Sequence, residues 1–308
     1  MKSVLITGSE GFLGRHLAGR LLRAGWSVRG IDRAVSARSH DRYEVEQIDV
    51  LDARRLAAFV AGRDFDAVVH LAAPTTHEEI VNRKTRTLKT NMQGTINLLE
   101  ACKASGVGTF VYASTGKVYG RIEKLPISEA HPTAPLNILG KTKIVAEKLI
   151  DFYCLDGPCR AAILRIFNVY GPGQRDYFLV PTILTQLARG KSTVTLGNIQ
   201  DRRDYVYVED VADAIAFVLG RRLEKQIEIF NVGSAAAHSA ADVVGTIGRI
   251  TGQQIGIAVD RSRFRKDECA VEYADIGKLA ALGWRPTHSL EEGLRKTVDN
   301  YLGALCKS

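Results

Sequence analysis

The chain has 308 residues, of which 45% are hydrophobic and 25% are charged, as is typical of a globular protein with a sizeable core. No stretch approaches the ~18 consecutive apolar residues of a membrane span, so we expect no membrane partner. The formal net charge is +8, but the basic residues are spread along the chain and mixed with acids, which argues against nucleic acid.

Apolar runs alternate with helical patterns through the first two thirds of the chain. The opening "SVLITG" predicts a buried strand rather than a signal peptide, because Thr7 and Gly8 cut the apolar run short. Residues 12–25 then predict a helix with Gly25 as its cap. Further strands are predicted at "SVRGID", "DAVVHLAA", "TFVYAS" and "AAILRIFN", and further helices at "NMQGTINLLEACKASG" and "GKTKIVAEKLIDFY". This alternation indicates an α/β protein with a Rossmann-type, doubly wound parallel sheet.

Beyond about residue 172 the pattern loosens. "RDYVYVEDVADAIAFVLG" and "QIEIFNVG" are interpreted as a helix and a strand that return to the sheet, whereas "SAADVVGTIGRITG" and "SLEEGLRKTVDNYL" predict a smaller helical lobe. We therefore expect a cofactor-binding domain at 1–171, to which 204–233 returns, and a C-terminal substrate-binding lobe of 172–203 and 234–308. A binding cleft is expected between them, at the carboxyl ends of the strands.

The five cysteines bear on the compartment in which the protein works. They show no close metal-ligand spacing, which favours a reduced, cytoplasmic protein. A disulfide between Cys154 and Cys159 is the less favoured alternative.

The segment "TGSEGFLG" places three glycines between the first strand and the first helix. Gly8 permits a tight turn, Gly11 lets the backbone approach a pyrophosphate, and Gly14 lets helix and strand pack closely. Asp32 ends the second strand, near the ~20-residue spacing of a ribose-binding acid. The motif predicts a dinucleotide site, and the carboxylate favours NAD over NADP, a preference that Arg33 is expected to soften. The simpler alternative is a glycine-rich turn with a solvated loop acid.

Several motifs together resemble those of the extended short-chain dehydrogenase/reductases, in particular the NAD-dependent nucleotide-sugar epimerases and dehydratases. The motifs are "TGSEGFLG", "HLAA" from His70, "NMQGTINLLEA" from Asn91, "STGKVYG" from Ser114, "LRIFNVYGPG" from Leu164, "RRDYVYVEDVADA" from Arg202 and "NVGS" from Asn231. The resemblance spans essentially the whole chain. It implies an enzyme that binds NAD and a nucleotide-diphosphate sugar.

The resemblance also implies site residues, position by position. Those implied for the cofactor are Gly8, Gly11, Phe12, Leu13, Gly14, Asp32, Arg33, Asp49, Val50, Leu71, Ala72, Ala73, Asn91, Lys143 and Phe167. Those implied for the substrate are Ser114, Thr115, Asn168, Arg203 and Arg265, with the two arginines at the diphosphate. For Arg203 the simpler alternative is a solvated surface charge beside Arg202. The match at Arg265 is weaker, because Lys266 and Asp267 replace the usual proline and glycine.

Two positions depart from the family pattern. Leu139 stands where the Tyr-x-x-x-Lys motif has its catalytic tyrosine, four residues before Lys143. Gly116 and Lys117 stand where dehydratases carry an acidic pair, which makes dehydration less favoured. Lys143 keeps an expected role at the nicotinamide ribose, against the alternative that it faces solvent.

Leucine cannot accept a proton, and loss of one general base typically costs ~10²–10⁴ in rate. The candidate substitutes are Lys117, Tyr119, His77, and Thr115 with a bound water. Against Lys117 stands the alternative of an exposed loop lysine, which is the usual state of lysines. We expect Thr115, Lys143 and Lys117 to be the catalytic residues.

The reaction that we favour is epimerisation through a transient 4-keto sugar. The alternatives are a 4-ketoreductase or dehydratase of a nucleotide sugar, and a protein that binds NAD and nucleotide without turnover because Leu139 has ended the chemistry. A reductase of another small molecule is weaker, since two arginines speak for a charged substrate. A homodimer is expected, because the apolar faces of 91–105 and 140–154 lie on helices that pair across a two-fold axis in the resembled family.

Overall fold

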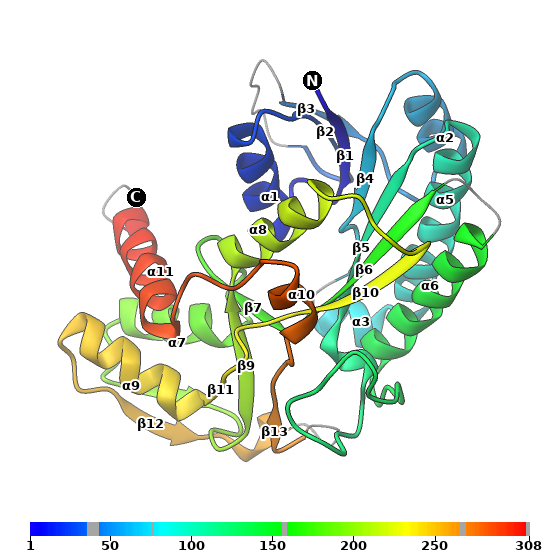
Figure 1. Ribbon diagram of the computed structural model, residues 1–308. Coiled ribbons are helices and arrows are strands. Elements are labelled where there is room, and N and C mark those ends of the chain that lie inside the picture. The colour runs from blue at the N-terminus through cyan, green and yellow to red at the C-terminus, as the bar shows by residue number, and fades with distance from the viewer. Residues whose placement is uncertain (36–42, 75–76, 156–158, 265–268, 306–308) are drawn as a thin grey trace. The chain divides into compact units, whose positions relative to one another are not determined.

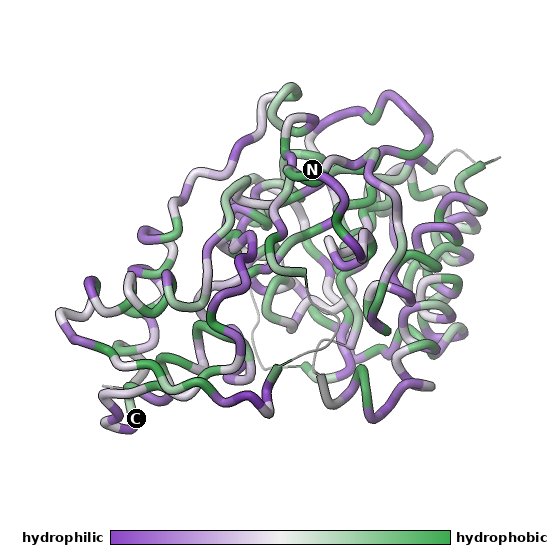
Figure 2. Tube along the Cα trace, turned by 90° about the horizontal axis from the view of Figure 1, so that it is seen from below, coloured by the Kyte–Doolittle hydropathy of each residue, from purple (hydrophilic) through white to green (hydrophobic). Residues whose placement is uncertain are grey.

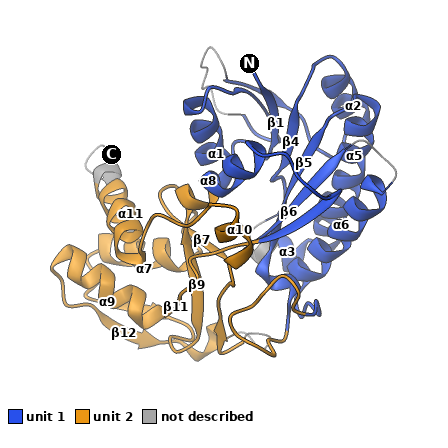
Figure 3. Ribbon diagram, viewed as in Figure 1, with its two compact units in different colours: residues 1–120, 132–166, 212–230 blue, residues 121–131, 167–211, 231–308 orange. Residues whose placement is uncertain are grey.

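The computed structural model describes residues 1–35, 43–74, 77–155, 159–264 and 269–305, which fall into two compact units (Figure 1 and Figure 3). Unit 1 spans 1–120, 132–166 and 212–230, and unit 2 spans 121–131, 167–211 and 231–308. This division differs from the expected one mainly at 121–131 and 204–211, which belong to unit 2. The first of these segments joins unit 2 because Ile127 forms a bridge with Ala274.

Unit 1 is built on a seven-stranded sheet in the order β10-β6-β5-β4-β1-β2-β3. Its strands are β1 (Ser3–Thr7), β2 (Ser27–Asp32), β3 (Tyr43–Gln47), β4 (Ala67–His70), β5 (Thr109–Thr115), β6 (Arg160–Ile166) and β10 (Ile227–Val232). The pairs from β6 to β3 are parallel, and the chain order reverses direction at β1. The predicted doubly wound sheet of Rossmann type is confirmed, with its switch point beside β1.

Helices cover both faces of this sheet (Figure 1). They are α1 (Phe12–Arg23), α2 (Ala53–Ala61), α3 (His77–Asn82), α4 (Lys84–Leu88), the π-helix η1 (Lys89–Gln93), α5 (Gly94–Ala104), α6 (Ile138–Cys154) and α8 (Val208–Leu219). Apolar residues of α2, α5 and α6 pack with those of the strands into one buried cluster. On the other face, Arg20 of α1 pairs with Asp213 of α8 at 2.7 Å. Apolar and polar residues alternate along the helical trace in Figure 2, as amphipathic helices require.

Local signals explain where the key helices begin and end. Gly25 follows α1 with φ +85, and its N–H donates to Leu22 O while Trp26 N–H donates to Leu21 O. This is the paired bonding of a Schellman motif, so the expected glycine cap is confirmed. Helix α6 begins after Asn137, whose side chain accepts from Gly140 N at 2.9 Å.

Unit 2 contains two small sheets as well as helices. Strands β11 (Ala237–Ser239), β9 (Arg202–Tyr207) and β13 (Val271–Glu272) lie side by side, β7 (Asn168–Tyr170) also pairs with β9, and β8 (Thr193–Leu196) pairs with β12 (Gly256–Val259). The helices are α7 (Leu179–Ala188), α9 (Ala240–Thr251), α10 (Gly277–Ala281) and α11 (Leu290–Leu305). The two helices expected in this lobe are present, but the lobe is not solely helical.

Strand β9 corrects the interpretation of its segment as part of a helix. "RRDYVY" is rich in the aromatic and β-branched residues that favour strands, and partners on both sides complete its pairing. Four described cysteines, Cys102, Cys154, Cys159 and Cys269, are free thiols. Among the helices of the described ranges, none has the length and apolar character needed to cross a membrane.

Candidate active site

The turn between β1 and α1 carries the predicted glycines. Gly8 adopts φ +71, and a Cβ there would come within 2.9 Å of Ala72 N, so the turn needs a residue without a side chain. A Cβ on Gly14 would collide with Gly8 O, which confirms close packing of helix against turn. Gly11 caps α1, whose first N–H groups therefore point out of the helix beside a backbone cradle.

Asp32 directs its carboxylate to the same turn from the end of β2. Oδ2 accepts from Glu10 N at 3.0 Å, and Oδ1 accepts from Arg33 N at 2.7 Å. A carboxylate has about four acceptor sites, so capacity for ribose hydroxyls remains. Asp32 is thus the last residue of a strand and is held against the glycine turn. The Arg33 guanidinium reaches Glu79 Oε1 at 3.4 Å, away from the carboxylate beside it in sequence.

Further predicted cofactor residues surround this turn in unit 1. Leu71 N and Ala72 N donate to the backbone and hydroxyl oxygens of Thr7, at 3.1 and 3.2 Å. Asp49 pairs with Arg86 at 3.4 Å. Three more, Phe12, Leu13 and Ala73, are half-buried, and Val50 is buried. The predicted residue Phe167 belongs to unit 2 and is also buried.

Asn91 has a different environment, because it lies in the π-helix η1 and is 1% exposed. Its Nδ2 donates to Thr142 Oγ1 at 2.9 Å, but its Oδ1 has no hydrogen-bond partner within the described parts of the chain. Buried acceptors are seldom left without a partner, and π-bulges often occur at functional sites. The side-chain carbonyl of Asn91 is thus available to accept a hydrogen bond from a bound ligand.

The predicted catalytic residues come from two neighbouring elements of unit 1. Thr115 ends β5, and its Oγ1 accepts from Lys117 N at 3.3 Å in the 3-10 turn η2 (Gly116–Val118). Gly140 packs the first turn of α6 on that turn, because a Cβ there would collide with Lys117 O. Leu139 therefore lies next to Lys117 in space, and both side chains are half-buried. Lys117 is thus not simply an exposed loop lysine.

Lys143 is buried, with 5% of its surface exposed. Its Nζ donates to Ala113 O at 2.7 Å and lies 4.5 Å from the centroid of the Tyr112 ring. Burial lowers the pKa of Lys143 to about 8, although the carboxylate of Glu147 opposes the shift. The alternative in which Lys143 faces solvent is wrong.

Tyr112 and Tyr119 are buried phenols of unit 1. Tyr112 is 1% exposed, and burial raises the pKa of its hydroxyl well above the ordinary value. Tyr119, one of the candidate bases, is 0% exposed and packs its ring 4.9 Å from the Arg165 guanidinium carbon. The side chain of His77, another candidate, lies outside the described residues. Lys117, Thr115 with a bound water, and His77 therefore stay candidates.

Ser114 belongs to a buried network and not to the exposed end of the site. Its Oγ donates to Glu147 Oε1, and Glu147 Oε2 accepts from Arg165 Nη2 at 2.8 Å. Both charged side chains are at most 5% exposed. We therefore assign Ser114 to this network and not to the substrate. Sequence reasoning missed Glu147, although its spacing of one helical turn from Lys143 places both on the same face of α6.

Asn168 and Arg203 lie on paired strands of unit 2. In these pairings Asn168 is opposite Tyr205, and Glu272 is opposite Arg203. Arg203 is 7% exposed, so it is not a solvated surface charge. That description fits Arg202, whose side chain is 47% exposed and pairs with Asp242 at 3.4 Å. Arg265 lies outside the described residues.

Arg203 and Asn168 share a carboxylate that sequence reasoning did not find. Arg203 Nε lies 3.5 Å from Glu272 Oε1, and Asn168 Nδ2 donates to the same oxygen at 3.2 Å. Asp201 supplies a further carboxylate oxygen 3.0 Å from Arg203 Nη2. The two predicted substrate residues of unit 2 thus form one polar cluster with two acids.

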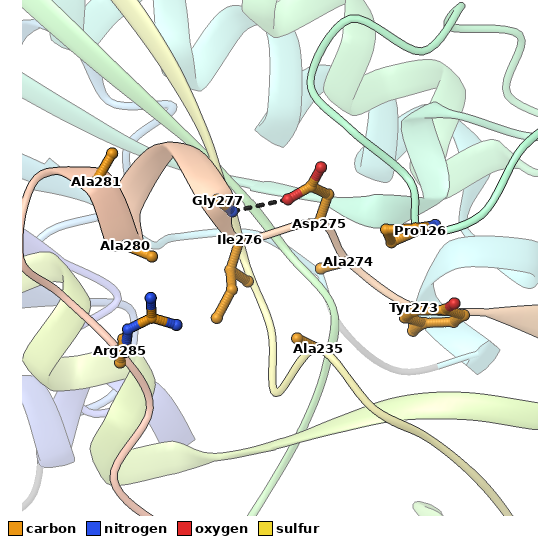
Figure 4. Close-up of a pocket in the computed structure, with 10 residues that line it drawn as sticks. All are labelled: Pro126, Ala235, Tyr273, Ala274, Asp275, Ile276, Gly277, Ala280, Ala281 and Arg285. Atoms are coloured by element: carbon orange, nitrogen blue, oxygen red, sulfur yellow. Dashed lines mark hydrogen bonds between the residues drawn. The ribbon is translucent and has the colours of Figure 1, made fainter.

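Unit 2 also has a hollow of about 450 Å³ beside α10 (Figure 4). Small or apolar residues such as Ala235, Ala274 and Ile276 line much of it, with Arg285 at one side. The Asp275 carboxylate in its wall caps Gly277 N at 2.8 Å. None of the predicted site residues within the described ranges lines this hollow, so it adds nothing to the candidate site.

A parallel sheet of this order, with a glycine turn and an acid at the end of β2, defines a dinucleotide-binding α/β protein. Residues 4–233 match the NAD dependent epimerase/dehydratase family, and the chain belongs to that family.

Individual relatives agree with this membership. UDP-glucose 4-epimerase from Bos taurus is 31% identical over 329 residues, which cover 94% of this chain and 93% of that protein. The structure of UDP-glucose 4-epimerase from Thermotoga maritima with UDP-glucose superposes with a TM-score of 0.91 at 28% identity, covering 98% of this chain and 99% of that one. The UDP-glucose 4-epimerase of Thermus thermophilus in complex with NAD gives a TM-score of 0.87 at 30% identity, with the same coverage.

Proposed function

We propose that the chain binds NAD in unit 1 and epimerises a nucleotide-diphosphate sugar through a transient 4-keto intermediate. Family membership supports the class of reaction, and relatives named as UDP-glucose 4-epimerases support epimerisation. The observation that carries the proposal is that the turn bearing Thr115 and Lys117 packs on the first turn of α6, the helix that carries Leu139 and buried Lys143.

The residues of unit 1 fit NAD. The turn at Gly8 and Gly14 forms a cradle that a Cβ would fill, and the N–H groups at the start of α1 would hold the pyrophosphate. Asp32 would accept from the ribose hydroxyls, and Lys143 would donate to the nicotinamide ribose. When bound, NAD supplies a hydride acceptor that can later return the hydride.

Oxidation at the sugar C4 also requires a group that takes the proton of the C4 hydroxyl. Leu139 has no such group, so we assign this role to Lys117, whose amine takes the proton and returns it when the carbonyl is reduced from the opposite face. Thr115 lies at the end of β5 beside Lys117, and its hydroxyl holds the reacting oxygen. Buried Lys143 keeps the cofactor side of the site in place.

The test is replacement of Lys117 by methionine. We expect Lys117→Met to lower kcat for the interconversion of UDP-glucose and UDP-galactose by ~10²–10⁴ while leaving UDP-glucose affinity nearly unchanged. Lys225→Met, at an exposed position of unit 1, is the matched control and should behave as wild type. Brisk turnover by Lys117→Met would exclude Lys117 as the base and move attention to Thr115 with water.

A second candidate function is binding of NAD and a nucleotide without turnover. Leu139 favours it, because a leucine lies where the proton acceptor is expected. The two candidates differ in whether bound NAD is reduced when a nucleotide sugar is added.

We also propose that the protein is a homodimer in the cytoplasm. Helix α6 exposes Val145 (37%) and Phe152 (75%), and the end of α4 exposes Leu88 (45%). Helices α5 and α6 lie side by side at the edge of unit 1 (Figure 1), which suits pairing with a second copy.

A further inference from the structure

Glu272 has no part in the proposed reaction, yet it lies beside both residues that are assigned to the substrate in unit 2. Strand pairing places Glu272 opposite Arg203 and Asn168 opposite Tyr205. Because side chains alternate along a strand, positions 203 and 205 face the same side of β9. Glu272, Arg203 and Asn168 therefore lie on one face of the strands β13, β9 and β7.

Carbonyl and carboxylate groups of the protein bind the Arg203 guanidinium. Nη1 donates to Cys269 O at 2.7 Å and to Arg202 O at 3.1 Å. Nη2 donates to Asp201 at 3.0 Å, and Nε lies 3.5 Å from Glu272. The exposed fractions of the side chains are 8% for Arg203, 10% for Glu272 and 18% for Asp201. Within the described residues, the buried Arg203 cation thus contacts the largely buried carboxylates of Glu272 and Asp201.

The Glu272 carboxylate also accepts a hydrogen bond from the Asn168 side chain. Its Nδ2 donates to Glu272 Oε1 at 3.2 Å and to Asp204 O at 3.1 Å. An amide nitrogen has two hydrogens, so both already have acceptors. Glu272 therefore engages both side chains that a nucleotide sugar would need.

A diphosphate that approaches this cluster meets like charge. It needs the N–H groups of Arg203, which now point to carboxylates and carbonyls, and it brings negative charge close to Glu272 and Asp201. Charges in a mostly buried setting interact more strongly than charges in water. The ligand must displace at least one carboxylate before it can form charge-assisted bonds to the guanidinium.

We propose that Glu272 is a specificity-determining residue that holds Arg203 and Asn168 in the ligand-free protein and lowers the affinity of unit 2 for a diphosphate group. This inference rests on the proposed function, which takes Arg203 as the diphosphate anchor. A nucleotide sugar then binds only when its diphosphate replaces the Glu272 carboxylate at Arg203. A sugar without a diphosphate cannot replace this carboxylate and does not bind at this site.

Calorimetric titration of the 308-residue chain tests the inference. UDP and UDP-glucose are titrated into wild type, Glu272→Gln, Asp201→Asn and Arg203→Ala, with NAD as a second ligand. We expect Glu272→Gln to bind UDP and UDP-glucose at least tenfold more tightly, Asp201→Asn to shift in the same direction, and NAD affinity to stay unchanged. Glu291→Gln, an exposed acid of α11 that pairs with arginines, is the matched control and should show no gain. Damage to a purely structural residue does not increase affinity.

The other outcomes separate the inference from the proposed function. If Glu272→Gln does not bind UDP or UDP-glucose more tightly than wild type, the inference is overturned. If thermal unfolding shows that Glu272→Gln is not folded, the affinities of Asp201→Asn decide in its place. If Glu272→Gln shows no gain but Arg203→Ala loses tenfold or more in affinity for UDP and UDP-glucose, Arg203 remains the diphosphate anchor and only the inference about Glu272 is overturned. If Arg203→Ala binds as wild type does, or if no variant binds either nucleotide, the anchor and the inference are both overturned.

Discussion

At the scale of single residues, Leu139 is the position on which the proposed chemistry depends. It precedes Gly140, whose missing Cβ lets α6 start against the carbonyl of Lys117. Lys143, four residues further on, is buried, and burial lowers its pKa to about 8. The surroundings of a proton acceptor are therefore kept, while the side chain at 139 cannot accept a proton.

We expect Leu139→Tyr to reduce bound NAD faster than wild type when UDP-glucose is added. The new phenol would lie one helical turn from Lys143, whose charge lowers the pKa of a neighbouring hydroxyl. The measurement is the absorbance of reduced nicotinamide in stopped flow, and we expect a gain of roughly ten- to a hundredfold. Leu136→Tyr, at a 45% exposed position nearby, is the control. Absence of NAD reduction in both wild type and Leu139→Tyr would favour the protein without turnover.

The position of Asp32 leads to a prediction about the preference for NAD over NADP. Its carboxylate lies at the turn that would receive the adenine ribose, so it should repel a 2′-phosphate and the chain should bind NAD more tightly than NADP. We expect Asp32→Ala to narrow the gap, measured as the ratio of the two dissociation constants. Asp64→Ala, at an exposed acid of unit 1, should leave the ratio unchanged. Equal binding of NAD and NADP by wild type would contradict the assignment.

At the scale of elements, buried His70 connects β4 to β1 and α5. Its Nδ1 lies 2.7 Å from Thr7 Oγ1, and its Nε2 lies 3.1 Å from Thr95 Oγ1. Thr95 donates its own hydrogen to Asn91 O, so we assign the ring proton to Nε2 and acceptance from Thr7 to Nδ1. The network requires a neutral imidazole.

This network predicts acid sensitivity. Burial, with a further contribution from the Lys143 charge, lowers the pKa of His70 from 6.5 to about 3. The unfolded chain therefore binds more protons than the folded chain between these values, and stability falls as the pH drops through that window. From pH 6.5 to about pH 5 the loss is roughly 2 kcal/mol in the free energy of unfolding.

Urea unfolding at about pH 7 and about pH 5 measures this loss. We expect His70→Gln to be less stable at both values but to lose about 2 kcal/mol less between them than wild type. His16→Gln, on α1, should keep the full pH dependence. An undiminished dependence in His70→Gln would show that other groups carry it.

At the scale of the whole molecule, the family match extends over both units, and the relatives cover nearly all of the chain. The outer face of unit 1 is the part that the proposed dimer would use. Val145 and Phe152 lie two turns apart on α6, so they share one exposed face.

We expect wild type to be a dimer at micromolar concentration and Phe152→Glu to be a monomer, because a charge would be buried in the apolar interface. Light scattering at several concentrations measures the mass. Leu302→Glu, at a 50% exposed position of α11, is the control and should stay dimeric. A monomeric wild type would refute the proposed assembly.

The main features of unit 1 were predictable because their sequence signals are local. The glycine turn, the cap at Gly25 and the alternation of strands and helices depend on neighbours along the chain, and the structure reproduces them. Asp32 was predictable for the same reason, since its spacing from the turn is fixed by one helix and one strand.

Other features required the tertiary structure, because they depend on pairing and on which face of an element is buried. Segment 202–207 is a strand through partners that are distant in sequence, and the burial of Tyr119 and Ser114 also depends on the fold. Glu272 and Arg203 meet only because β13 pairs with β9. Sequence spacing determines which residues share a helix turn or a strand end, whereas the cross-strand neighbours of a charge are determined by the fold.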